Sequence, residues 1–326
     1  MSLAARSQYY RRIFSAYLGS GRSQLTFWHE TPESNPRARN DQLGEYYMRF
    51  RVKGDYPGPY DSNGIPQLDY RGVIGRQYNP IAIAQWGLAN YNLFCETGDG
   101  GRWEKTLKAV DWLCTNLEKN SHGLWVWNHH FDWEYRQTLK APWYSGLAQG
   151  QGISLLLRVH AKTKDEKYLE AARRALVSLT RPMAAGGVLF EDDEKNLWIE
   201  EYLVIPPTHI LNGFMWALWG VFDFWLAHAD PAAKEVFDRG VVTLAHNLER
   251  FDTGYWSLYE QSGTRLKMLA SPFYHRLHIV QLRVMAILTG QNVFTEFADR
   301  WESYAQRRTN RTRALIEKSA FKLFYY

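Results

Sequence analysis

The sequence predicts a mainly α fold, an (α/α) toroid of about four helical hairpins with short β-hairpin excursions and a small N-terminal arm. Helix-like segments recur in pairs with a period of roughly 65 residues, a pattern typical of helical-hairpin repeats. The first helix of each pair is apolar on nearly every side, whereas the second has a single apolar face. We therefore expect an inner ring of buried helices inside an outer ring of amphipathic ones.

Each helix of the array has an expected position. The inner helices should begin near Pro80, Trp143, Pro207 and Tyr274. The outer helices should lie near 102–119, 164–180, 231–250 and 291–308. In the first outer helix, the spacing of one helical face is visible in Leu107, Val110, Leu113 and Leu117. Together these segments predict a helical domain over roughly 80–308.

A glycine and a short aromatic or β-branched run follow each of the first three outer helices, starting at Gly123, Gly187 and Gly254. Loops at one position of a helical repeat emerge on one face of the array. We therefore expect residues 124–135, 187–204 and 254–273 to share a face, and we expect the functional site there.

Residues 1–79 lack the repeat and are expected to form an N-terminal arm, while 80–326 form the toroid. Proline and glycine at 57–59, 64 and 66 surround short alternating stretches such as YYMRFRV, which predicts loops and a few strands. Between Met1 and Trp28 there is no apolar core of a signal peptide, and no later stretch reaches about 18 uninterrupted apolar residues. The expectation is a soluble, cytoplasmic protein with no membrane partner.

Composition and charge indicate which class of ligand the protein binds. Aromatic residues make up 15% of the chain, with 14 Trp and 20 Tyr, which suits either an aromatic core or half-wet clefts where sugar rings stack. The formal charge of +5 should attract polyanions. Because no nucleic-acid-binding signature is present, an acidic glycan is favoured over nucleic acid. Cys95 and Cys114 fall in apolar helical patterns, which predicts buried free thiols and neither disulfides nor a metal site.

Four motifs in order carry a family resemblance. They are WYSGLAQGQGISLLLR at 143–158, EEY at 200–202 followed by NGF at 212–214, the LY pair ending at Tyr259, and YHRLHIVQL at 274–282. Each alone fits a buried helix or a packed loop. Together they resemble the D-glucuronyl C5-epimerases from about residue 140 to 305, with a weaker trace at 64–92.

The resemblance implies a helical-toroid catalytic domain, a homodimer, no redox cofactor, and conversion of glucuronate to iduronate in heparosan-type chains. It implies catalytic roles for Glu201, Tyr202, Tyr259 and Tyr274. The candidate substrate-binding residues are Trp143, Tyr144, Gln149, Asn212, Arg265, Arg276 and His278.

The chain departs from the family pattern at two places. Animal members carry a β-sandwich after the first inner helix, whereas here Tyr91 runs almost directly into the outer helix at Arg102. They also carry an arginine where this chain has Ser262, so Arg265 and Arg276 are the nearest candidates to bind the carboxylate.

The chemistry of C5 inversion fits these residue types. Removing a proton next to a carboxylate adds negative charge, which fixed donors or cations must offset, and Asn212, Arg276 and His278 are candidates. Inversion needs an acid or base on each ring face, which places Tyr274 opposite the Glu201/Tyr202 pair. A tyrosinate base also needs nearby positive charge, because a phenol ordinarily has a pKa of about 10.

Three other functions use similar features. A polysaccharide lyase begins with the same C5 proton abstraction and then expels the C4 oxygen. An unsaturated-glucuronyl hydrolase needs an acidic residue that activates water, whereas the strongest motifs here centre on tyrosines. A repeat array can also bind glycans without catalysis.

Overall fold

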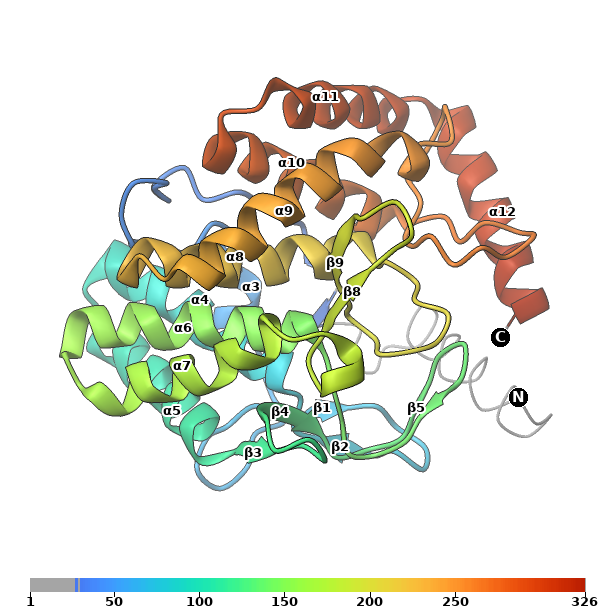
Figure 1. Cartoon of the computed structure of the whole chain (residues 1–326). Helices are drawn as coiled ribbons and strands as arrows, with labels where there is room; N and C mark the ends of the chain where they lie inside the picture. The colour runs from blue at the N-terminus through green and yellow to red at the C-terminus, as the bar shows by residue number, and fades with distance from the viewer. Residues whose placement is uncertain (1–26, 29, 326) are drawn as a thin grey trace.

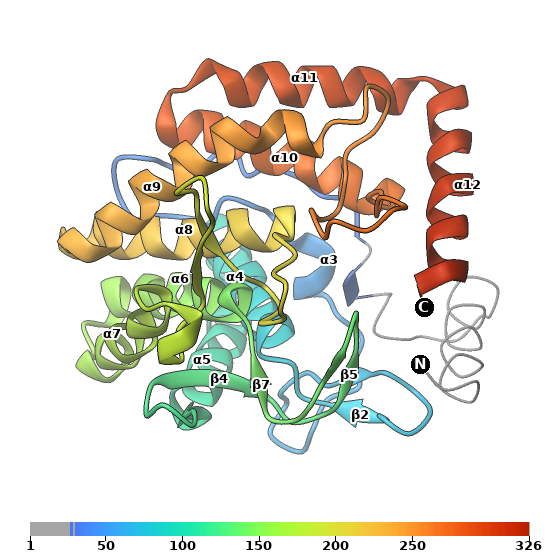
Figure 2. The same ribbon diagram turned by 45° about the vertical axis from the view of Figure 1, so that its right-hand side comes forward.

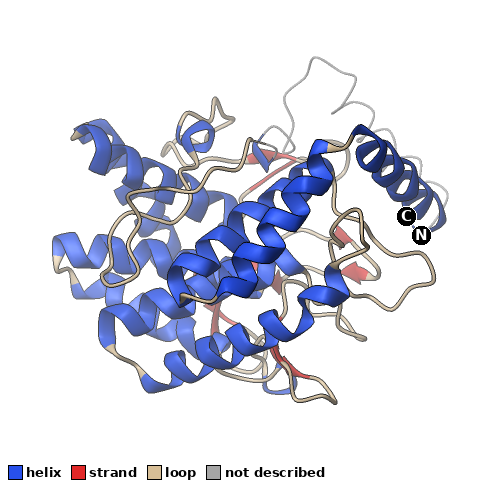
Figure 3. Cartoon of the chain, turned by 90° about the horizontal axis from the view of Figure 1, so that it is seen from above, coloured by secondary structure: helices blue, strands red, loops and turns tan. Residues whose placement is uncertain are grey.

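The computed structural model describes residues 27–28 and 30–325, which are mostly helical with a few short strands (Figures 1 and 3). Four helical hairpins form an (α/α) toroid, as predicted. The inner helices are α4 (Pro80–Thr97), α6 (Gly146–Thr163), α8 (Leu211–His228) and α10 (Pro272–Thr289). The outer helices are α5 (Gly100–Thr115), α7 (Glu166–Leu179), α9 (Pro231–Asn247) and α11 (Asn292–Gln306). Successive inner helices pack against each other, α4 on α6, α6 on α8 and α8 on α10.

Two glycines allow the closest of these helix contacts. A Cβ at Gly150 of α6 would lie 2.9 Å from the carbonyl oxygen of Trp216, and a Cβ at Gly220 of α8 would overlap the backbone of Gly150. The two helices therefore touch backbone to backbone, because neither has a side chain at the crossing.

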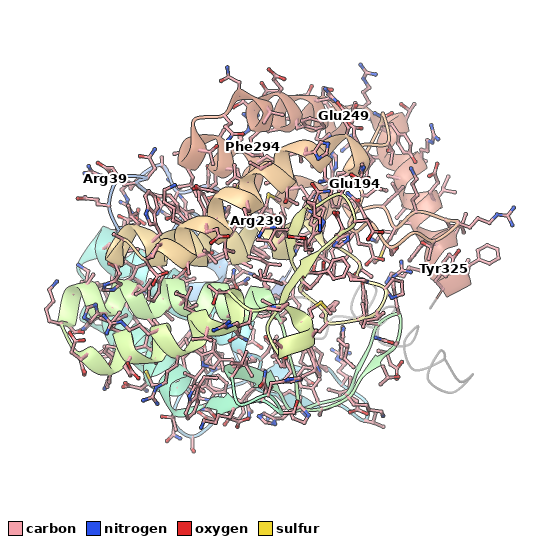
Figure 4. All side chains as sticks on the ribbon, in the orientation of Figure 1. Arg39, Glu194, Arg239, Glu249, Phe294 and Tyr325 are labelled. Atoms are coloured by element: carbon pink, nitrogen blue, oxygen red, sulfur yellow. The ribbon has the colours of Figure 1, made fainter. Side chains whose placement is uncertain are left out.

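The outer helices carry the charged surface. Arg239 of α9 pairs with Glu191 at 2.5 Å, and Arg300 of α11 pairs with Glu249 at 2.8 Å; Arg239 and Glu249 are labelled in Figure 4. Exposed pairs of this kind each add little stability. The apolar faces of these helices, such as Phe294 and Trp301 of α11, supply the burial that holds the outer ring in place.

Three predicted helix boundaries were wrong. Inner helix α6 begins at Gly146, because the Ser145 side chain caps it by accepting the Ala148 N–H, and Trp143 lies in a strand. Helix α8 begins at Leu211, after a loop that contains Pro207. The first outer helix ends at Thr115, and Leu117 pairs as a strand with Trp127.

The excursions after the outer helices are small sheets. The first contains β3 (Leu117–Lys119), β4 (Trp125–His129) and β7 (Trp143–Tyr144) in one sheet, with β5 (Trp133–Glu134) paired to β6 (Thr138–Leu139) beside it. The second pairs β8 (Leu189–Glu191) with β9 (Leu197–Ile199), after a 3-10 helix η1 (Met183–Ala185). The third follows η2 (Leu248–Phe251) and has only isolated bridges, Asp252 to Ser257 and Leu258 to Leu269, so the expected hairpin is absent there.

The three excursions meet on one face, as predicted. The Tyr135 ring of the first lies 4.5 Å from the Tyr202 ring of the second, and the Tyr135 hydroxyl donates to Glu260 of the third. A side-chain cluster around Tyr135, Val204 and Tyr259 is the apolar centre of this meeting point.

The described part of the arm packs on the inner helices. Its elements are α3 (Arg51–Gly54), β1 (Leu68–Asp69) and β2 (Arg76–Gln77), whereas residues 1–26 of the predicted arm lie outside the described residues. YYMRFRV was expected to be a strand, but only Met48 forms a bridge and a helix starts at Arg51. The Tyr47 hydroxyl donates to Asp223 of α8, and Asn40 donates to the Ile287 carbonyl of α10. The arm therefore shares the core of the toroid; the boundary at residue 79 stays a prediction.

A further helix, α12 (Arg308–Tyr325), follows the repeats and stands beside the third excursion (Figure 2). Within residues 27–28 and 30–325, none of the helices combines the length and the apolar character needed to span a membrane. The expectation of buried thiols was wrong. Cys95 is exposed and Cys114 is only partly buried, because both lie near the C-terminal ends of their helices.

Candidate active site

A cavity of about 160 Å³ lies at the N-terminal ends of the four inner helices. Its lining from these ends includes Asn79, Ile81, Leu147, Asn212 and Tyr274. Side-chain caps from Asn79, Ser145 and Ser271 define three of the four helix starts. Because the positive end of each helix dipole lies at its N-terminus, the cavity is suited to a negatively charged ligand.

Three of the four predicted catalytic residues line this cavity: Glu201, Tyr202 and Tyr274. Glu201 and Tyr202 follow β9, whose end is fixed because the Glu200 carbonyl accepts the Gly146 N–H at 2.9 Å. Tyr274 lies in the first turn of α10, where its N–H donates to the Ser271 hydroxyl at 3.3 Å. Adjacent repeats thus place Tyr274 and the Glu201/Tyr202 pair, the two predicted acid–base groups, in the same cavity.

Glu201 is only 6% exposed, and burial raises its pKa from 4.5 to about 8. The Tyr202 side chain lowers this pKa, whereas the charges of Glu260 and Glu200 raise it. The Asn212 amide lies 3.5 Å from the Glu201 carboxylate. Near neutral pH the carboxyl group is therefore mostly protonated, so it can donate a proton and then accept one.

Tyr259, the fourth predicted catalytic residue, lies behind the cavity. Its ring meets the Tyr274 ring edge-on, with centroids 4.9 Å apart. Its N–H donates to the Met268 carbonyl at 2.8 Å, and its carbonyl accepts the Leu211 N–H at 3.1 Å. Burial, followed by the charge of Glu201, raises the pKa of the Tyr259 phenol well above 10. This position suits support of Tyr274 better than direct contact with substrate.

Aromatic side chains form one wall of the cavity. Trp143, a predicted binding residue, stacks on His129 with the ring centroids 3.8 Å apart, and both residues line the hollow. The other aromatic lining residues are Trp28, Tyr70, Phe131, Trp133, Tyr202, Trp216 and Tyr274. A wall of this kind suits the apolar faces of sugar rings.

His129 is a buried neutral imidazole that the sequence did not single out. Burial lowers its pKa to about 3. Its Nδ1 lies 3.3 Å from the Trp143 carbonyl oxygen, which can only accept, so Nδ1 carries the proton and Nε2 is left as an acceptor. The Nε2 atom has no hydrogen-bond partner among the described residues.

Two predicted binding residues have structural roles instead. Both amide atoms of Gln149 are bonded to the backbone of Trp127, and its nitrogen also donates to the Ser145 carbonyl. The Tyr144 hydroxyl donates to the Gly186 carbonyl at 2.8 Å, which ties the first excursion to the second. Neither residue belongs to the cavity lining.

The predicted basic and imidazole partners of the substrate also lie outside the cavity. His278 is fully buried one helical turn below Tyr274, with Nδ1 3.1 Å from the Ser257 hydroxyl, and burial keeps its pKa well below 6.5. Arg265 and Arg276 are exposed and do not line it. Among the residues named as charge-stabilising groups, only Asn212 lines the cavity.

A cation lies in an adjoining hollow. No Lys or Arg lines the main cavity within the described part of the chain, but Lys53 and Glu30 line a smaller one of about 30 Å³. The two hollows share Trp28, Gln85, Trp216 and Tyr274 as walls. Burial lowers the Lys53 pKa to about 8, and its ammonium donates to the Phe27 carbonyl at 2.6 Å.

Arg136 fills the space next to Ser262. It bonds to Glu260 through Nε at 2.8 Å and through Nη2, which also donates to the Ser262 hydroxyl. The side chain of Glu260 is fully buried, whereas that of Arg136 is 21% exposed. The family pattern has an arginine at the position of Ser262, on the third excursion. Here the Arg136 guanidinium, from the first excursion, reaches that position instead.

The remaining lining residues carried weak signals in the sequence. Gln85 and Trp216 are single side chains within apolar inner helices, and His129 lies two residues after the aromatic run 123–127. The excursion 124–135 was expected at the site, but the sequence does not show which of its residues face inward. Residues 27–28 and 30–325 contain no group of three or more His, Cys, Asp or Glu side chains suited to hold a metal ion.

Solved structures share the fold. A family 76 glycoside hydrolase from a bovine Bacteroides thetaiotaomicron strain aligns with a TM-score of 0.50 and 13% identity, over 74% of this chain and 50% of that one. A D-mannose isomerase aligns with a TM-score of 0.50 and 8% identity, over 93% of this chain and 69% of that one. At such identities, the likeness concerns the fold alone.

Sequence relatives are more specific. A D-glucuronyl C5-epimerase of Caenorhabditis elegans is 34% identical over 213 residues, which cover 60% of this chain and 34% of the relative. An uncharacterized protein of Methanocaldococcus jannaschii is 27% identical over 201 residues, covering 61% of this chain and 64% of the relative. The chain thus spans about a third of the length of the first relative and just under two thirds of the length of the second.

The family match covers the part of the chain that builds most of the cavity. The model described as D-glucuronyl C5-epimerase C-terminus matches residues 119–303, more than half of the 326 residues. Trp143, Glu201, Tyr202, Asn212 and Tyr274 all lie within this match and line the cavity. The chain belongs to the D-glucuronyl C5-epimerase family.

Proposed function

We propose that this protein is a carbohydrate epimerase that inverts C5 of uronate residues within an acidic polysaccharide, converting D-glucuronate to L-iduronate in a heparosan-type chain. The observation that carries the proposal is that Glu201 with Tyr202 and Tyr274 come from adjacent repeats and line the same cavity. Family membership supports the reaction type. The heparosan-type substrate follows from the family resemblance.

The proposed reaction moves one proton out and one proton in. A base on one face of the ring takes the C5 proton, and the electron pair left at C5 delocalises into the adjacent carboxylate. An acid on the other face then returns a proton to C5, so no bond to C4 breaks and no oxidant is needed. Tyr274 and the Glu201/Tyr202 pair are assigned to opposite faces, and they exchange roles in the reverse reaction.

The charge of the intermediate needs stabilisation, because the reacting group is already anionic. The inner helix N-termini direct their positive ends at the cavity, and the Asn212 amide lies beside Glu201. Lys53 lies in the adjoining hollow, which shares the Tyr274 wall, and the Glu30 carboxylate 4.0 Å from its ammonium offsets part of its charge. The formal charge of +5 favours encounter with a polyanion.

The polymer would be held mainly by the aromatic wall. Trp143 and Trp133 belong to the first excursion and Trp28 to the arm, so side chains from both sides of the hollow offer rings for stacking. The homodimer implied by the family resemblance stays a prediction, which sedimentation of the full chain tests.

The direct test is incubation with unsulfated heparosan in deuterated water, followed by proton NMR. The proposal expects deuterium at C5 and new iduronate signals while the chain length is unchanged. New absorbance from a 4,5-unsaturated uronate would instead identify a lyase. Binding without any isotope exchange would reduce the function to glycan binding.

A further inference from the structure

Helix α12 lies outside the 119–303 family match, yet it packs directly on the tyrosine cluster. Phe321 is 1% exposed and belongs to the apolar cluster that contains Tyr135, Tyr259 and Met268. Glu317, one turn earlier, accepts a hydrogen bond from the Tyr255 hydroxyl. Helix α12 is therefore fastened along one face to the excursion that carries Tyr259.

Lys318 lies between these two anchors. Its ammonium donates to the Leu269 carbonyl at 2.7 Å and lies 5.9 Å from the centre of the Tyr259 ring. In the same excursion, the N–H of Tyr259 is bonded to the carbonyl of Met268, the residue before Leu269. The ammonium thus lies over the Tyr259 ring and, through the Leu269 carbonyl, also holds the segment whose Met268 carbonyl accepts the Tyr259 N–H.

Lys318 is only partly exposed, and packing alone does not require an ammonium at this position. Transfer of a charged amine into an apolar interior is unfavourable unless other groups compensate, whereas a methionine of similar length would fill the space without this cost. Here the Leu269 carbonyl, the Tyr259 ring and the negative charge of Glu260 provide compensation. Fixed positive charge is what a site needs when its reaction adds negative charge in a low-dielectric environment.

We propose that Lys318 is a positioning residue of this site, which holds Tyr259 against Tyr274 from α12 and supplies a positive charge beside the Tyr259 ring. The inference rests on the proposed epimerase function. It assigns the charge-stabilising role that the sequence placed on Arg276 and His278 to a lysine outside the family match.

The groups around Lys318 define its expected pH behaviour. Tyr259 and Glu260 face Lys318 from the third excursion, and Arg136 pairs with the Glu260 carboxylate. His278 faces it from α10. On α12 itself, the neighbouring charged residues are Glu317 and Lys322. Burial lowers the Lys318 pKa to about 8. The ammonium is therefore lost as the pH rises through this value, and activity that depends on it should fall on the alkaline side. Arginine keeps its charge in this range.

The test compares K318M, K318R and the control R311M, which removes an exposed cation from the same helix. Deuterium exchange at C5, kcat, KM and thermal unfolding are measured for each between pH 6 and 10. We expect K318M to lose at least about tenfold in kcat with KM little changed, because the lost interaction strengthens only in the transition state. K318R should keep most of the activity and sustain it to higher pH, and R311M should match the wild type.

Each outcome decides the inference. Wild-type kcat and pH profile in K318M would overturn it, and so would a K318R variant as inactive as a folded K318M. If K318M does not fold, K318R still decides, because an alkaline limb that stays where it is in the wild type contradicts the proposed charge role. A wild type without C5 exchange rejects the proposed function and this inference together, whereas an active wild type with an equally active K318M rejects the inference alone.

Discussion

Gly213 lies directly against the carboxyl group of Glu201. A Cβ at position 213 would overlap Oε2 of Glu201 and approach its Cβ to 2.8 Å. Gly213 is the third residue of α8, so the start of this helix forms the surface on which the Glu201 side chain rests. The absence of a side chain at 213 sets the position of the carboxyl group in the cavity.

Replacing Gly213 with alanine should therefore displace Glu201. We expect G213A to lose at least about tenfold in kcat, since misplacing a catalytic group by about 1 Å can reduce the rate by up to two orders of magnitude. Helix propensity alone would make alanine more stable by about 1 kcal/mol. The control is G100A in the first turn of α5, where a Cβ meets nothing within 4 Å. Equal kcat values for the two variants would contradict the placement of Glu201.

The ion pair between Arg136 and Glu260 should stabilise the contact between the first and third excursions. R136M leaves the fully buried Glu260 carboxylate without its guanidinium, which should cost about 3–5 kcal/mol of unfolding free energy. Urea denaturation measures this loss. The control R174M breaks the exposed pair of Arg174 with Glu170 and should cost no more than about 1 kcal/mol. A loss in R136M as small as that in R174M would show that the pair does not hold the excursions together.

The raised pKa of Glu201 should make stability fall with pH. Its pKa in the folded protein is about 8, above its ordinary 4.5, so its contribution is fully present below pH 4.5 and is lost as the pH rises through 8. Glutamine is neutral throughout, so the unfolding free energy of E201Q relative to the wild type should increase by a few kcal/mol between pH 5 and pH 8.5, at about 1.4 kcal/mol per pKa unit. The same substitution at the exposed Glu104 serves as the reference. A pH-independent difference for E201Q would refute the buried protonated state.

Trp143 should contribute to polymer binding. Its ring stacks on His129 and lines the cavity, so W143L should raise KM for heparosan roughly 2–10-fold, which corresponds to about 0.5–1.5 kcal/mol of lost stacking. W125L is the matched control, because Trp125 lies in the same excursion but does not line the cavity. If W125L raised KM as much as W143L, the effect would come from the excursion as a whole.

The arrangement of inner and outer helices could be predicted, because the apolar pattern of each helix is visible in its own sequence. Helices such as α6 and α8 are apolar on all sides and α7 and α11 on one, so periodicity alone assigns them to the inner and outer rings. Helix starts were less accurate. Ser145 caps α6 through its side chain, a signal that apolar periodicity does not contain.

The site was predicted only in part, because residues of one motif can lie at the cavity or deeper in the core. Tyr274 and His278 share a face of α10, but one turn of helix is about 5.4 Å, so Tyr274 reaches the cavity at the helix N-terminus and His278 lies in the core. Arg136 could not be inferred from local spacing, because it is separated from Ser262 by 126 positions in the sequence. Contacts between excursions depend on how the four hairpins pack together, which no local pattern encodes.

The most direct test of the two-sided site is the separate assay of Y274F and Y202F for C5 deuterium exchange and for iduronate formation from heparosan. Y274F should abolish net inversion, whereas exchange at C5 can persist if the Glu201 side both takes and returns the proton on its own face. Y202F should reduce inversion while both proteins keep wild-type thermal unfolding. Inversion at the wild-type rate in both variants would contradict the assignment of Tyr274 and the Glu201/Tyr202 pair to opposite faces of the substrate.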